Sequence, residues 1–178
     1  LLYAGNMGHP NDLETIIEGA KRLRDNSSLH FIFLGTGVKE PILRNAVDAA
    51  KLENVTILAP RPRSEQFVFL NACDVGLVSL VENMKGVSMP SRTYNILAAG
   101  KPILALTEPD SELAKVIDED QVGWHVRPGD VDGLVSTILE INNGRSLLLK
   151  FGERARRTAE TNYSLETAIE KYRSALFT

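Results

Sequence analysis

Apolar residues in this chain gather in short runs that alternate with amphipathic segments. Runs such as FIFL (31–34) and PILAL (102–106) are apolar throughout and lack the in–out alternation of a strand with one wet face. The segment DLETIIEGAKRLRD (12–25) instead places apolar residues at the spacing of a helix with one buried face. Continuous apolar runs between such helices are typical of parallel strands that are buried on both faces.

This alternation predicts an α/β fold, a Rossmann-like doubly wound parallel six-stranded sheet with helices on both faces. The expected strands are residues 1–5, 29–37, 54–58, 74–80, 102–106 and 122–127. The expected helices are residues 12–25, 40–52, 64–73, 91–99, 110–119, 131–143, 146–161 and 164–177. Pro41 is tolerated in a first helical turn, and Ser64 is expected to cap the helix that it begins.

Composition adds little beyond a globular domain. The 178 residues suffice for one domain, and 43% hydrophobic with 24% charged content is ordinary. A formal net charge of -3 argues against a nucleic-acid partner. Cys73 is the single cysteine, which excludes an internal disulfide and fits a reducing compartment. The chain opens inside an expected strand, so we expect it to be a piece of a longer chain.

Ligands of such sheets bind beyond the carboxyl ends of the strands, so the loops there are the candidate sites. In GNMGHPN (5–11), Gly5 and Gly8 permit close backbone approach, and Asn6 and Met7 lie between them. With the free amides of the following helix, this loop can cradle an anion, although a tight turn explains it equally well. Gly37, in the turn GTG, is a weaker candidate because neither a third glycine nor Lys-Ser/Thr follows it.

Arginines follow the third expected strand. Arg61 and Arg63 each follow a proline in PRPRSE (60–65), a loop that the prolines stiffen. Either guanidinium could reach a phosphate or a base, and for at least one of them solvent is the expected surrounding.

The strongest candidate is the loop and short helix in GVSMPSRTYNILAAG (86–100). Its polar front precedes and opens the helix, and comprises Ser88, Met89, Pro90, Ser91, Arg92 and Asn95. Pro90 suits a helix start, Gly100 suits its end, and the amides of residues 91–93 should be unpaired. Tyr94, Leu97 and Ala98 are expected to face the core.

This front offers what an anion and a sugar need. Arg92 can donate charge-assisted hydrogen bonds, and the amide of Asn95 suits a pair of sugar hydroxyls. A cation at a helix start opposes the helix dipole, so we interpret Arg92 as a ligand-binding residue. The three histidines show no metal-ligand spacing, no Ser/His/Asp set is evident, and no catalytic residue is assigned.

Taken in order, these segments resemble the carboxyl-terminal half of a GT-B glycosyltransferase of family 4, the group 1-like enzymes. GNMGHPNDLETIIEG (5–19) is similar to the family's G-R-L-x-x-x-K-G-x-x-x-L-I-E-A, and MPSRTYNILAAGKPILAL (89–106) to its L-E-A-M-A-x-G-x-P-V-V-A. VGWHVRPGDVDGLVSTI (122–138) resembles the family's closing segment. The form PSRTYN is most similar to bacterial enzymes that build surface polysaccharides.

The resemblance implies that residues 1–178 form the domain that holds a nucleotide-sugar donor, with a UDP-sugar favoured. The acceptor, a polysaccharide or lipid-linked sugar, would bind an amino-terminal domain outside this chain, so this half alone should be inactive. Family members use no bound metal or cofactor and usually retain the anomeric configuration. The resemblance also implies a cytoplasmic enzyme, with any peripheral membrane contact made through the other half.

Carried over by position, several binding residues of the family are replaced here. The family's diphosphate-binding arginine and lysine fall on Asn6 and Asn11, and its ribose-binding glutamate falls on Asn95. The partner acidic residue falls on Val87. We expect Arg92 to supply the missing positive charge, and the resemblance places Arg61 and its neighbours near the base.

Two alternatives remain open from the sequence. One is a nucleotide-sugar epimerase-like enzyme of the same architecture, although the acidic and histidine residues expected for epimerisation are not evident. The other is a non-catalytic nucleotide-binding module, which the uncharged residues Asn6, Asn11 and Val87 would suit.

Overall fold

Six parallel strands form one sheet in the order β3-β2-β1-β4-β5-β6, which confirms the predicted fold class. The computed structural model describes residues 1–87 and 89–177. The strands are β1 (Leu2–Ala4), β2 (Phe31–Leu34), β3 (Val55–Leu58), β4 (Gly76–Ser79), β5 (Ile103–Leu106) and β6 (Gly123–Val126). The order reverses between β1 and β4, and such a reversal leaves a crevice at the carboxyl ends of the strands.

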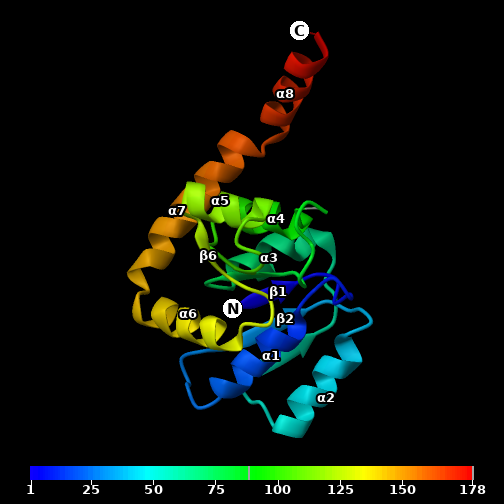
Figure 1. Cartoon of the computed structure of the whole chain (residues 1–178), viewed down its shortest axis with the longest axis vertical. Helices are drawn as coiled ribbons and strands as arrows, with labels where there is room; N and C mark the ends of the chain where they lie inside the picture. The colour runs from blue at the N-terminus through cyan, green and yellow to red at the C-terminus, as the bar shows by residue number, and fades with distance from the viewer. Residues whose placement is uncertain (88, 178) are drawn as a thin grey trace.

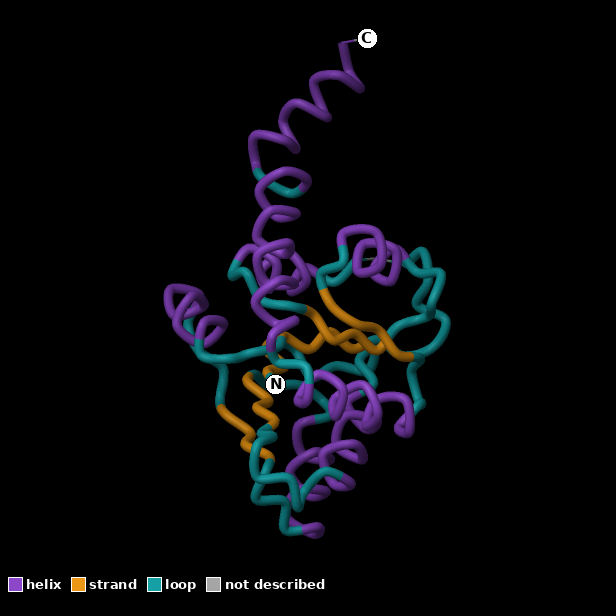
Figure 2. Tube along the Cα trace, turned by 90° about the vertical axis from the view of Figure 1, so that its left-hand side faces the viewer, coloured by secondary structure: helices purple, strands orange, loops and turns teal. Residues whose placement is uncertain are grey.

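Helices cover both faces of the sheet (Figure 1). One layer holds α1 (Leu13–Arg22), α2 (Glu40–Ala50) and α6 (Val131–Asn143). The other holds α3 (Gln66–Asn71), α4 (Ser91–Ala98), α5 (Glu112–Asp120) and α7 (Ser146–Asn162). The final helix, α8 (Leu165–Phe177), continues beyond α7 and projects from the body of the domain (Figures 1 and 2).

The strands divide the hydrophobic core into two clusters, one on each face. In β1, Tyr3 belongs to the cluster under α1, α2 and α6, whereas Leu2 belongs to the cluster under α4, α5 and α7. The same strand residues pair in parallel register, with Tyr3 opposite Phe33 of β2. Both faces are therefore apolar, as the unbroken runs in the sequence predicted.

Two local expectations are wrong. Ser64 does not cap a helix, because it lies inside a short 3₁₀ turn, η1 (Arg63–Glu65), that leads into the six-residue α3. In α4, the side chains buried in the core are Thr93, Ile96 and Leu97, and Tyr94 is 36% exposed. Tyr94 instead packs edge-on against Tyr163 at the end of α7, with ring centroids 4.9 Å apart.

None of the helices in the described ranges combines the length and apolar character needed to cross a bilayer.

Candidate functional site

A cavity of about 880 Å³ opens beyond the carboxyl ends of β1 and β2, between the first two loops and helices α3 and α4. Seven of the residues singled out from the sequence line it, namely Gly5, Asn6, Arg61, Arg63, Ser91, Arg92 and Asn95. The structure thus brings together residues from two loops and from helix α4, which lie far apart in the chain.

The other predicted site residues lie elsewhere or cannot be placed. Met7 is fully buried in the core, and Gly8, Gly37, Met89 and Pro90 are not among the lining residues. Ser88 lies outside the described residues. Gly37 has a structural reason to be glycine, because a Cβ there would lie 2.5 Å from the Met7 carbonyl oxygen.

The first loop is locked against the second by backbone contacts. Gly5 donates its N–H to the Leu34 oxygen at 2.9 Å, and a Cβ on Gly35 would lie 2.0 Å from the Gly5 oxygen. The Asn6 carbonyl accepts hydrogen bonds from Tyr3 Oη at 2.6 Å and from Asn11 Nδ2 at 3.2 Å. This part of the cavity wall is therefore a fixed backbone surface.

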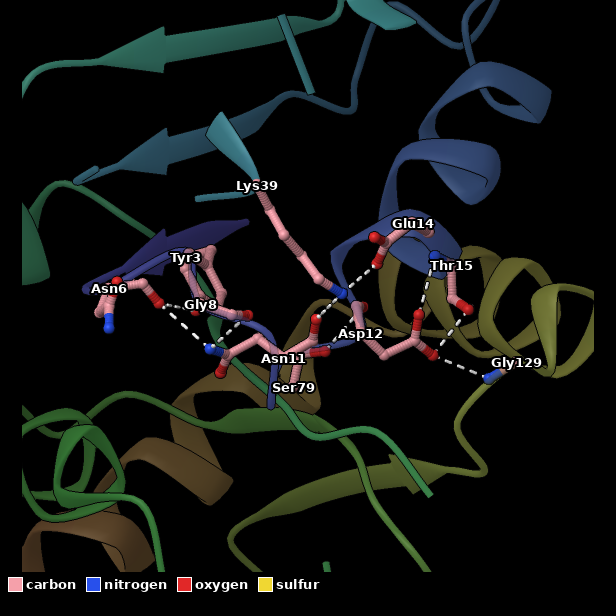
Figure 3. Close-up of polar contacts among 10 residues, drawn as sticks. All are labelled: Tyr3, Asn6, Gly8, Asn11, Asp12, Glu14, Thr15, Lys39, Ser79 and Gly129. Carbon is pink, nitrogen blue, oxygen red and sulfur yellow. Dashed lines mark hydrogen bonds and ion pairs between the residues drawn. The ribbon is translucent and has the colours of Figure 1, made fainter. Parts of the chain in front are cut away.

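Asn11 is a structural residue of this loop (Figure 3). Asn11 is 8% exposed, and its Nδ2 donates to the carbonyls of Asn6 and Gly8. Lys39 approaches from the second loop and places its Nζ 2.8 Å from both the Asn11 carbonyl and Glu14 Oε2 (Figure 3). Asn11 thus braces the first loop, and it is not among the residues that line the cavity.

The amino terminus of α1 is already occupied by Asp12. Its buried carboxylate accepts from Thr15 N at 3.1 Å, from Thr15 Oγ1 at 2.7 Å and from Gly129 N at 2.8 Å (Figure 3). A carboxylate at this position already meets the positive end of the helix dipole. At the first turn of α1, the Asp12 carboxylate therefore takes the Thr15 amide and places a negative charge where an anion would bind.

Helix α4 presents a different start. Its N-cap is Pro90, whose side chain has no polar atom and so makes no capping hydrogen bond. The Thr93 amide, which was expected to be unpaired, donates to the Pro90 oxygen at 3.0 Å. No acceptor within the described ranges takes the amides of Ser91 and Arg92. Among the described residues these two donors have no partner, so they are candidates for contact with a ligand.

The carboxyl-terminal end of α4 is capped at Gly100, as predicted. Gly100 adopts a φ of 65°, its N–H donates to the Leu97 oxygen, and the N–H of Lys101 donates to the Ile96 oxygen. These two bonds form a Schellman motif, which satisfies the last carbonyls of the helix. The helix is therefore short and firmly ended, and its amino terminus is held at the cavity.

Arg92 extends from α4 across the end of β1. Its guanidinium carbon lies 4.2 Å from the centre of the Tyr3 ring, and Nη2 lies 3.4 Å from the Asn6 oxygen. It passes over Gly5, where a Cβ would lie only 3.2 Å from Nη2. Its Nη1 is buried and has no hydrogen-bond partner among the residues that the structure describes.

Every charged side chain among the described lining residues is an arginine. Arg61 is 3.7 Å from Glu65, an exposed pair that contributes little and leaves the cation largely available. Arg63 stands exposed beside Gln66 and Phe69 on the same wall. The cavity is therefore a positively charged site with an apolar floor.

The sequence did not single out Tyr3 as a site residue, because it stands among apolar residues in an expected strand. It is fully buried, and burial raises the pKa of its phenol, while the neighbouring Arg92 acts in the opposite direction. The hydroxyl stays protonated near neutral pH and donates to the Asn6 oxygen. The signal available in the sequence was a tyrosine in a buried strand, since a buried hydroxyl requires a partner.

Within residues 1–87 and 89–177, no three His, Cys, Asp or Glu side chains are grouped so that they could hold a metal ion.

Comparisons with known proteins show which family the chain belongs to. The profile described as "Glycosyl transferases group 1" matches residues 1–143. The probable glycosyltransferase WbjE of Pseudomonas aeruginosa is 33% identical over 170 residues, which are 96% of this chain and 42% of that protein. The putative colanic acid biosynthesis glycosyl transferase WcaI of Escherichia coli K12 is 28% identical over 173 residues, 97% of this chain and 41% of that protein.

Solved structures agree on the fold. Anabaena Alr3699/HepE, crystallised in complex with UDP, superposes with a TM-score of 0.81 at 15% identity over 98% of this chain and 48% of its own. A glycosyltransferase from Rickettsia africae gives a TM-score of 0.75 at 20% identity, with 98% and 47% coverage. The chain thus spans less than half of these relatives. It belongs to the group 1 glycosyl transferase family and has the Rossmann-like fold of GT-B enzymes.

Proposed function

We propose that the cavity binds the nucleoside diphosphate of an activated sugar and that the chain is the donor-binding domain of a glycosyltransferase. The observation that supports this most strongly is Arg92, which lines the cavity and has a buried Nη1 without a partner among the described residues. An unsatisfied buried donor is costly, and an anion relieves that cost with a charge-assisted bond. The uncapped start of α4 lies beside it and adds to the attraction.

The rest of the cavity suits a nucleoside. Asn95 lies one helical turn beyond Ser91 and can both donate to and accept from ribose hydroxyls. Phe69 and the Arg61–Arg63 loop form the wall where we place the base. UDP or UDP-glucose was bound in several of the solved structures that resemble this chain, so uridine is the base that we propose.

We also propose that the donor binds without a divalent cation. Three arginines line the cavity and can neutralise the diphosphate, a task that a metal ion performs in other sites. Binding of UDP should then be equally tight in EDTA and in buffer with magnesium. A requirement for the metal would contradict this part of the proposal.

Transfer needs a second domain in this proposal. The matched relatives are more than twice as long as this chain, and they include enzymes named for colanic acid and amylovoran biosynthesis. We therefore propose a polysaccharide or lipid-linked sugar as acceptor, held by a domain outside these residues. We place the enzyme in the cytoplasm, where the free thiol of Cys73 stays reduced.

Isothermal titration calorimetry with UDP, ADP, GDP and TDP tests the binding step. The expected result is a single site with UDP preferred, and the chain alone should show no sugar transfer. A chain that binds none of the four nucleotides refutes the proposal. A longer protein that binds UDP but transfers no sugar would instead indicate a nucleotide-binding module.

A further inference from the structure

We infer that Tyr3 is a positioning residue for the diphosphate site, because its ring supports the Arg92 guanidinium and its hydroxyl fixes the neighbouring loop. This inference rests on the proposed function, since it concerns how the donor's charge is received. Tyr3 does not line the cavity, so it would act only through its neighbours.

The ring gives Arg92 a defined place. Tyr3 points to the face of the sheet under α1 and α2, whereas Arg92 comes from α4 on the opposite face. The guanidinium meets the ring by crossing the end of β1 above Gly5, with its central carbon 4.2 Å from the ring centre. A cation over a buried aromatic face is held electrostatically, yet its outward N–H groups remain available to an anion.

The hydroxyl fixes the loop beside the cation. Tyr3 Oη donates to the Asn6 oxygen at 2.6 Å, the same oxygen that Arg92 Nη2 and Asn11 Nδ2 approach. The other end of this peptide, the Met7 N–H, donates to the Thr36 oxygen at 2.8 Å. The Asn6–Met7 peptide is thus held at both ends.

Tyr3 is itself held rigidly. It is fully buried, and its ring packs against Phe33 of β2 with centroids 6.0 Å apart. Burial raises the pKa of the phenol, so the hydroxyl remains a donor. A leucine would fill part of the space but offer neither the aromatic face nor the hydroxyl, and a phenylalanine would offer only the face.

Binding of UDP and of uridine to variants of the chain separates positioning from general stability. The ratio of the two affinities measures what the diphosphate contributes, and a purely structural change lowers both affinities alike. Tyr3→Leu should lower this ratio about 3- to 30-fold, the range of one cation–π contact. Tyr3→Phe keeps the ring and loses only the hydrogen bond, so it should lower the ratio by about twofold or more but by less than Tyr3→Leu does.

Two controls make the result specific. Phe33→Leu removes the aromatic ring that packs against Tyr3 and should lower thermal stability while the ratio stays at its wild-type value. In an Arg92→Met background, Tyr3→Leu should lower the ratio no more than Tyr3→Phe lowers it in the wild type, because only the hydroxyl's hold on the loop is then lost. If Tyr3→Leu fails to fold, Tyr3→Phe still decides the role of the hydroxyl.

The outcomes are distinguishable. Should Arg92→Met weaken UDP binding while both Tyr3 variants keep the wild-type ratio, the positioning role is overturned and the proposed function stands. Should the wild-type chain bind no UDP, the proposed function fails and takes this inference with it.

Discussion

Replacing Arg92 by methionine separates the binding role of its charge from the packing role of its stem. Methionine keeps an unbranched chain that can still cover Tyr3, but it has no donor. In the unliganded protein, the change removes a cation held 4.2 Å over the Tyr3 ring, together with a buried Nη1 that no described residue satisfies. The two effects on folding have opposite signs.

The expected sizes follow from these contacts. Loss of a desolvated cation–π contact costs about 1–2 kcal/mol of stability, and removal of a buried unpaired donor returns about 1–3 kcal/mol. The free energy of unfolding should therefore change by between a loss of about 1 kcal/mol and a gain of about 2 kcal/mol. A charge-assisted bond to the diphosphate contributes about 1.5–3 kcal/mol, so the Kd for UDP should rise roughly 10- to 150-fold.

Calorimetric titration with UDP and urea denaturation of the same preparations give both quantities. The matched control is Arg154→Met, since Arg154 also lies over an aromatic ring, that of Phe151 at 5.8 Å, but outside the cavity. This control should bind UDP as the wild type does. An Arg92→Met chain with unchanged UDP affinity would refute the assignment of Arg92 to the diphosphate, and a parallel loss of stability and affinity would show a structural role only.

Two substitutions and one labelling experiment test the packing of the domain around the site. Asp12→Ala should lower the free energy of unfolding in urea by about 2–4 kcal/mol, because it removes a helix cap and buried hydrogen bonds to a charged group. The control Asp130→Ala removes an exposed cap and should lower it by about 1 kcal/mol. Equal losses would contradict the buried network around Asp12. Gly35→Ala should lower the midpoint of thermal unfolding more than Gly86→Ala does. A Cβ on residue 35 would lie 2.0 Å from the Gly5 oxygen, whereas a Cβ on residue 86 would meet nothing within 4 Å. The reverse order would refute the close contact between the two loops. Because burial raises the pKa of Cys73, the thiolate fraction is small in the folded chain, so disulfide-exchange labelling at pH 8 should be much slower than after unfolding in urea; equal rates would argue against the buried thiol.

The sheet and most helices could be predicted because their signals are local. Apolar runs of four or five residues mark strands that are buried on both sides, and glycine and proline mark the ends of α4. The strands are shorter than expected because the extended backbone ends at residues such as Gly5 and Gly35, which have positive φ although each N–H still donates to the neighbouring strand. Periodicity indicates which residues are buried in a strand but not where its last hydrogen bond lies.

Half of the candidate site could be predicted for a similar reason. Arg92 and Asn95 are one helical turn apart on the cavity side of α4, so their spacing alone groups them. Tyr94 was misplaced because two apolar stripes fit this short helix, and its partner Tyr163 lies almost 70 residues further along the chain. Long-range contacts of this kind leave no periodic signal.

The first loop was the least predictable part. Its glycines suggested an anion cradle, but Asp12 already fills the start of α1 and the Asn11 side chain binds the loop itself. The Asp12 cap could have been inferred from an aspartate directly before an amphipathic helix. The role of Tyr3 depends on Arg92, a residue in another layer of the fold, and follows only from three-dimensional proximity.

A crystal structure of the chain with UDP tests the central claim most directly. The account predicts that phosphate oxygens lie within hydrogen-bonding distance of Arg92 Nη1 and of the free amides at the start of α4, with the uracil toward the loop of Arg61 and Arg63. Phosphates found away from α4, or a nucleotide bound outside the cavity, would contradict it.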